Sequence, residues 1–133
     1  MWQKKKTGKR FERLVAALNV WATEGAEVKW DDEIEGRQVD VSIRFRKGFY
    51  DYLVVIECKD YAGSVPGEKV EAFAKRLGKL KADKGVMVSR YGFQQGFGTE
   101  LARDEGIGLY TLEEIDESWP DKEKKETVTI GAN

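Results

Sequence analysis

The sequence predicts an α/β fold in which helices flank a mixed central sheet. Apolar residues recur at helical spacing in some stretches and alternate with polar residues in others, and glycine or proline stands at many of the boundaries. The predicted order is helix, three strands, helix, strand, helix, strand, which is typical of an α/β sandwich. A length of 133 residues suits one domain.

The first predicted helix covers residues 9–23 and follows a basic arm at residues 1–8. Gly25 ends it, since glycine is common just past a helix. Its apolar side chains fall on one face, and they are Phe11, Leu14, Val15, Leu18 and Trp21.

Three strands follow. We expect the first at residues 26–32, with a turn at Glu35-Gly36, and the third at residues 49–61 after a turn at residues 46–48. The strand between them shows the clearest alternation in the chain. One face is predicted to carry Val39, Val41, Ile43 and Phe45, and the other Gln38, Asp40, Ser42 and Arg44. The apolar run Val54-Val55-Ile56 indicates that the third strand is internal to the sheet.

The second half alternates helices with strands. Pro66 is well placed at the start of a second helix, whose apolar face holds Val70, Phe73, Ala74, Leu77 and Leu80. We expect a strand at residues 84–89, a short helix at 96–105 and a last strand at 107–112. The early strands should pair antiparallel and the later ones parallel. One domain thus covers residues 9–119, and residues 120–133 form a charged tail.

Composition excludes several kinds of chemistry. The chain has no His and a single Cys, Cys58, so it cannot build a Ser-His-Asp triad, an imidazole zinc site or an intrachain disulfide. A bound metal would take oxygen ligands, which favours Mg²⁺ or Mn²⁺. The net charge of −1 does not indicate a strong nucleic-acid binder. No apolar run reaches the roughly 20 residues that cross a bilayer, and we expect a cytoplasmic protein without membrane contact.

Asp40, Glu57 and Lys59 form the candidate site. Glu57 and Lys59 are two apart on one strand and share a face, and hairpin pairing would bring Asp40 to the same cation. A carboxylate directly after Val-Val-Ile is costly to bury unless it is paired or bound to metal. Two such acids with a nearby lysine suit metal-assisted hydrolysis of a phosphodiester. The alternative is a Glu57–Lys59 ion pair on a solvated strand end.

These residues resemble the split PD-(D/E)xK signature of a nuclease superfamily. Its two parts match Gly36-Arg-Gln-Val-Asp40 and Val55-Ile-Glu57-Cys-Lys59. The downstream runs Gly85-Val-Met-Val-Ser89-Arg-Tyr-Gly92-Phe93 and Gly106-Ile-Gly-Leu109 resemble the Mrr-like branch of restriction endonucleases. The likeness covers roughly residues 9 to 112.

The resemblance implies a restriction-endonuclease-like αβββαβ core, a Mg²⁺-dependent site and DNA as the substrate. It assigns the metal to Asp40 and Glu57, the motif lysine to Lys59, and a supporting acid of the first helix to Glu12. Glu12 has an alternative reading as a carboxylate that complements the helix dipole. Val39 stands where the motif has Pro, and Glu57 stands where many Mrr-like members have Gln.

Some alternatives remain open from the sequence. The chain could be a non-catalytic DNA-binding or protein-interaction module that keeps the nuclease fold, or a repair or junction nuclease that reads DNA shape. A homodimer would supply two sites for the two DNA strands, and a separate subunit or domain would supply recognition.

The second helix also carries several basic residues. We interpret them as a solvated face, with contact to the DNA backbone as the alternative. These residues are Lys75, Arg76, Lys79 and Lys81.

Overall fold

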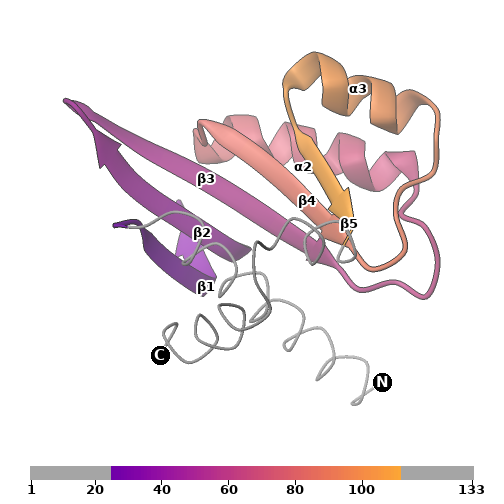
Figure 1. Ribbon diagram of the computed structural model, residues 1–133, viewed down its shortest axis with the longest axis horizontal. Coiled ribbons are helices and arrows are strands. Elements are labelled where there is room, and N and C mark those ends of the chain that lie inside the picture. The colour runs from indigo at the N-terminus through magenta and orange to yellow at the C-terminus, as the bar shows by residue number, and fades with distance from the viewer. Residues whose placement is uncertain (1–24, 112–133) are drawn as a thin grey trace, which may run out of the picture.

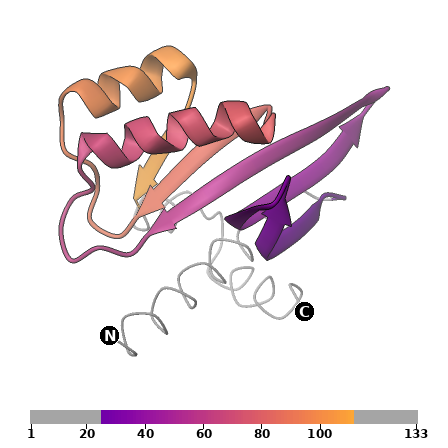
Figure 2. The same ribbon diagram turned by 180° about the vertical axis from the view of Figure 1, so that it is seen from behind.

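A computed structural model describes residues 25–111. Within them, five strands form one sheet in the order β1-β2-β3-β4-β5, and two helices lie on one face of it (Figure 1 and Figure 2). The elements are β1 (Glu27–Ile34), β2 (Arg37–Lys47), β3 (Tyr50–Lys59), α2 (Gly67–Leu80), β4 (Lys84–Ser89), α3 (Phe97–Glu105) and β5 (Gly108–Thr111).

The sheet is mixed, as the sequence predicts. β1, β2 and β3 pair antiparallel, whereas β4 runs parallel to β3 and β5 runs parallel to β4. β3 has a partner on each side, so its apolar centre is internal to the sheet. The predicted first helix, Glu12, the basic arm and the charged tail lie outside the described residues.

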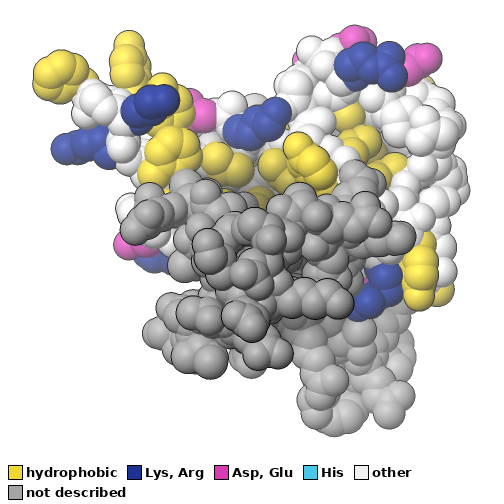
Figure 3. Space-filling model, in the orientation of Figure 1, with side chains coloured by type: hydrophobic (Ala, Val, Ile, Leu, Met, Phe, Trp, Pro, Cys, Tyr) yellow, Lys and Arg dark blue, Asp and Glu magenta, His cyan; other side chains and the backbone are white. Residues whose placement is uncertain are grey.

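The turn between β2 and β3 lies later than predicted. Lys47 pairs with Tyr50, so Arg46 and Lys47 belong to the strand and only Gly48 and Phe49 form the loop. Gly48 has φ 63°, a left-handed conformation that glycine adopts without a steric penalty and that a two-residue hairpin loop favours. The hairpin projects from the domain, and exposed hydrophobic side chains gather at its end (Figure 3).

Two apolar clusters lie on the sheet. The first packs strand residues against the helices through Val55 and Met87 of the sheet and Val70 and Phe73 of α2. Within residues 25–111 the buried members of the second all come from strands, and they are Val41, Ile43, Ile56 and Val88. Glu57 alternates with Ile56, and it therefore lies on the helix-covered face with Val55.

The predicted alternation of β2 is wrong at one position. Val41 and Ile43 belong to the second cluster, but Val39 packs in the first cluster. The neighbouring β1 leaves regular extended geometry at this point, because Asp31 has φ 57° between the Trp30–Val41 and Asp32–Val39 pairs. We attribute the change of face at Val39 to this interruption of the pleat.

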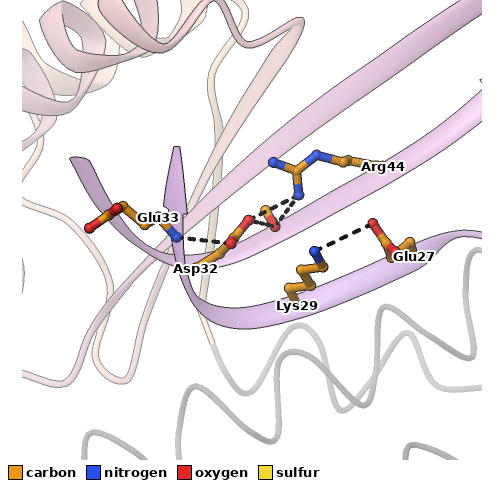
Figure 4. A network of polar contacts seen from close by, with 6 residues as sticks. Glu27, Lys29, Asp32, Glu33 and Arg44 are labelled. Carbon is orange, nitrogen blue, oxygen red and sulfur yellow. Dashed lines mark hydrogen bonds and ion pairs between the residues drawn. The ribbon is translucent and has the colours of Figure 1, made fainter. Parts of the chain in front are cut away.

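A polar network holds β1 against β2 beside that interruption (Figure 4). Ser42 donates a hydrogen bond of 2.7 Å to Asp32, and Arg44 donates one of 2.9 Å to the same carboxylate oxygen. The Glu33 N–H donates to the other oxygen. Partial burial works to raise the pKa of Asp32, but these donors outweigh it and hold the pKa below its usual value.

We predict that Asp32→Asn destabilises the protein at neutral pH by about 1–2 kcal/mol, because the buried Ser42 hydroxyl and the partly exposed Arg44 lose a charged acceptor. A depressed carboxyl pKa stabilises the fold above the unfolded pKa of about 3.9 and ceases to do so as pH falls through the folded pKa. The difference between wild type and variant should therefore shrink below about pH 4 in urea denaturation.

Asp51→Asn provides the control. Asp51 pairs with Arg46 at 2.9 Å, but both side chains are exposed, so its loss should leave stability nearly unchanged. An Asp32→Asn effect that is equally small, or that does not depend on pH, would contradict the structural role of this network.

Candidate active site at the end of β3

The candidate site lies where the β2–β3 ladder ends. The last paired residues are Val41 and Ile56, and the same register carried one step further sets Asp40 opposite Glu57. There the Cys58 N–H donates a 2.8 Å hydrogen bond to Oδ2 of Asp40 instead of to a β2 carbonyl. The end of the ladder thus turns the Asp40 carboxylate toward the backbone of β3.

Glu57 is the central charged group of the site, and its side chain is 12% exposed. Its Oε2 lies 2.8 Å from the Lys59 ammonium, and its Oε1 accepts a hydrogen bond from Arg76 of α2 at 2.5 Å. Glu57 therefore has a cation at each oxygen. Such pairing offsets the cost of desolvating a carboxylate.

Asp40 has a different environment. Burial raises the pKa of its carboxyl, and the Cys58 hydrogen bond opposes this rise without cancelling it. The negative charge of Glu57 adds to the rise. Among the described residues, Oδ1 of Asp40 accepts no hydrogen bond, so this half-buried oxygen has a lone pair to offer a cation.

Lys59 remains positively charged in this setting. Burial works to lower the pKa of the ammonium, but the hydrogen bond to Glu57 and the charge of that carboxylate raise it above the usual value. The Tyr61 ring also lies 5.9 Å from the ammonium nitrogen. A lysine held as a cation is suited to stabilising negative charge rather than to accepting a proton.

Arg76 was not among the predicted site residues, and its assignment to a solvated helix face is wrong. Its second guanidinium nitrogen donates to the Gln38 carbonyl of β2 at 2.5 Å, while the first contacts Glu57. One signal was available in the sequence. Arg76 lies three residues after Phe73 and four before Leu80, which is the spacing of the buried face.

A divalent cation fits this donor set. Mg²⁺ retains several waters and is often bound through only one or two carboxylates, which Asp40 and Glu57 can provide. Within residues 25–111 there is no group of three or more acidic, Cys or His side chains that could hold a metal. Further ligands would come from water, from backbone carbonyls or from residues such as Glu12.

Other polar contacts frame the same edge of the sheet. The carboxyl ends of β3, β4 and β5 coincide, because Lys59 pairs with Ser89 and Ser89 pairs with Thr111. Directly after these strands, Arg90 forms an ion pair of 2.6 Å with Asp60. The carboxyl edge of parallel strands is the usual place for a ligand site in an open α/β sheet.

A comparison with protein families gives the class. The family model Mrr_cat, described as a restriction endonuclease, matches residues 4–119 of the chain. The chain belongs to this restriction endonuclease family, and it is a nuclease domain. A search of curated proteins finds no match.

Solved structures show the same fold. The chain is similar to a protein of unknown function, AF1548, with a TM-score of 0.66 and 20% identity over 91% of this chain and 76% of that one. It is also similar to the DNA modification-dependent restriction endonuclease AspBHI, with a TM-score of 0.64 and 18% identity over 92% of this chain and 35% of that one. A third is MspJI restriction endonuclease in complex with a 27-mer oligonucleotide, with a TM-score of 0.59 and 18% identity over 93% of this chain and 31% of that one.

The mixed sheet with helices on one face is therefore a restriction-endonuclease-like fold, as expected. The chain spans about a third of the length of AspBHI and of MspJI. No helix within residues 25–111 is long and apolar enough to span a membrane.

We predict that Glu57→Gln destabilises the protein without metal by about 1–2 kcal/mol, because two cations lose their shared counter-charge. The figure is lower than for a fully buried pair, since Lys59 and Arg76 are 21% and 36% exposed. Urea denaturation in the presence of chelator measures this difference in the free energy of unfolding. The matched control is Glu71→Gln, an exposed position of α2, where we expect less than about 0.5 kcal/mol. Equal effects at the two positions would show that these ion pairs contribute nothing to stability.

Proposed function

We propose that this domain is a Mg²⁺-dependent endonuclease that hydrolyses phosphodiester bonds of DNA, with Mn²⁺ able to replace Mg²⁺. The observation that supports the proposal most is the pair of acids at the end of the β2–β3 ladder. Asp40 is half-buried, and burial raises the pKa of its carboxyl even though the Cys58 N–H donates a hydrogen bond to it. A carboxylate kept in this setting is costly for the fold and is typical of a functional site.

Asp40 and Glu57 would hold the cation, and Glu12 stays in the proposal as a supporting acid. A bound divalent cation would polarise the phosphate and lower the pKa of a water molecule. Lys59 would contact the phosphate with its ammonium group and stabilise the negative charge that grows during attack. Its hydrogen bond to Glu57 sets the direction of that ammonium.

We further propose that the substrate is recognised with help from outside this domain. The match to about a third of AspBHI and MspJI is consistent with a catalytic module to which recognition is added by another domain or subunit. A homodimer would place one site on each DNA strand. A cytoplasmic location belongs to the same proposal, as does PD-(D/E)xK chemistry.

The test is DNA cleavage by the purified protein. Supercoiled, linear, methylated and branched DNA are incubated with Mg²⁺, with Mn²⁺ and with chelator. We expect cleavage with either metal and none with chelator, and a loss of roughly 100-fold or more in Asp40→Asn and Lys59→Ala. Asn at position 40 keeps an oxygen acceptor for the Cys58 N–H, so this variant removes mainly the charge.

Lys75→Ala is the control, because Lys75 is exposed on α2 and next to Arg76 in sequence. It should cleave at nearly the wild-type rate. Metal-dependent cleavage that survives both site substitutions would refute the assignment of Asp40 and Lys59. Absence of cleavage on every substrate would favour a binding module that retains the nuclease fold.

A further inference from the structure

Arg76 joins three parts of the site through one side chain. From α2 it donates one hydrogen bond to Oε1 of Glu57 on β3 and another to the carbonyl of Gln38 on β2. Gln38 lies two residues before Asp40. The guanidinium therefore bonds to both strands that carry the proposed metal ligands.

Each carboxylate oxygen of Glu57 lies next to a cation. Arg76 occupies the side of Oε1, and Lys59 occupies the side of Oε2 at 2.8 Å. A carboxylate oxygen has lone pairs for more than one partner, so crowding alone does not exclude a metal. Repulsion does oppose it, because a divalent cation would lie within a few ångströms of a guanidinium in a partly buried site.

The net charge of the site also indicates that a divalent cation and Arg76 do not bind Glu57 together. Among the described residues of the site, the ionised acids Asp40 and Glu57 balance Lys59 and Arg76, and this set of four side chains is neutral without metal. Adding a divalent cation while both basic groups stay would leave an excess of two positive charges. Moving Arg76 away lowers the excess to one, which a phosphodiester, with one negative charge, would neutralise.

Arg76 is the cation that can leave. Its side chain is 36% exposed and reaches the site from another element, whereas that of Lys59 is 21% exposed and lies two residues from Glu57 on the same strand. The Tyr61 ring gives Lys59 a second contact. A long, flexible side chain at the edge of the site can turn its charged end to solvent, and the bound metal would offset the loss of its two hydrogen bonds.

We propose that Arg76 is a built-in counter-cation of Glu57, which a divalent metal ion displaces when it binds. This inference rests on the proposed metal site. In the metal-free protein Arg76 keeps the ends of β2 and β3 together and neutralises Glu57. It thereby preserves the site in the absence of metal, and it lowers the affinity of the site for metal because the two cations compete for one carboxylate.

The experiment measures Mn²⁺ binding by calorimetry, with no DNA present. Arg76→Met keeps much of the length of the side chain and removes its charge, and Arg76→Lys keeps a charge. We expect Arg76→Met to bind Mn²⁺ about tenfold more tightly than wild type, because the competing charge is gone. Arg76→Lys should stay within about threefold of wild type. Lys75→Met, at an exposed position of the same helix, should not change the affinity.

A second measurement separates displacement from a purely structural role. In chelator, Arg76→Met should melt at a lower temperature than wild type, since Glu57 loses a partner. Saturating Mn²⁺ should then raise its melting temperature more than it raises that of wild type. A structural role alone would lower the melting temperature without tightening Mn²⁺ binding.

The possible results are distinguishable. If wild type binds Mn²⁺ and Arg76→Met binds it equally or more weakly, the displacement proposal is overturned and the metal site stands. If neither wild type nor Arg76→Met binds Mn²⁺, the proposed metal site is itself wrong, and this inference falls with it. Circular dichroism in the near ultraviolet confirms that each variant is folded before binding is measured.

Discussion

The hydrogen bond from the Cys58 N–H to Asp40 is the interaction on which the candidate site depends. In a regular hairpin a backbone carbonyl of the neighbouring strand would accept from such an N–H, and the two strands would stay paired to their ends. Here the ladder stops at Val41 and Ile56, and a side-chain oxygen accepts in its place. The Asp40 carboxylate is thereby bonded to the backbone of β3, at the residue next to Glu57.

This arrangement has an electrostatic cost that the rest of the fold offsets. Burial raises the pKa of Asp40, and the negative charge of the nearby Glu57 adds to the rise. Lys59 comes from the same strand as Glu57, and Arg76 comes from α2, so the packing of the helix on the sheet places the second counter-charge. The apolar cluster that includes Val70 and Phe73 packs α2 against the sheet, so that Arg76 reaches Glu57. The apolar core thereby positions the charged side chains of the site, although no core residue contributes a charged group to it.

Much of this could be predicted from the sequence, because it follows from local patterns. The helical spacing of apolar residues predicted α2. Because side chains alternate along a strand, the two-residue separation of Glu57 and Lys59 predicted that they share one face of β3. The antiparallel start and parallel finish of the sheet followed from short turns and intervening helices. The face of Val39 could not be predicted, since we attribute it to the irregular backbone of Asp31 on the neighbouring strand β1, which the pattern of β2 does not contain.

Arg76 was missed for a related reason. Its spacing from Phe73 and Leu80 is that of the inner face of α2, but a sequence pattern assigns a charged residue to solvent unless a partner is known. That partner is Glu57, nineteen positions earlier in the chain. Contacts between distant segments are set by packing, and only the folded structure shows that a helix cation reaches a strand carboxylate.

The most direct test of the central claim is a crystal structure of the protein grown with Mn²⁺ and measured at the manganese absorption edge. The account predicts an anomalous peak between the carboxylates of Asp40 and Glu57, with Arg76 turned away from Glu57. A peak elsewhere, or full retention of the Arg76–Glu57 contact beside a bound ion, would contradict it. The wild-type protein suffices for this measurement, and no DNA is required.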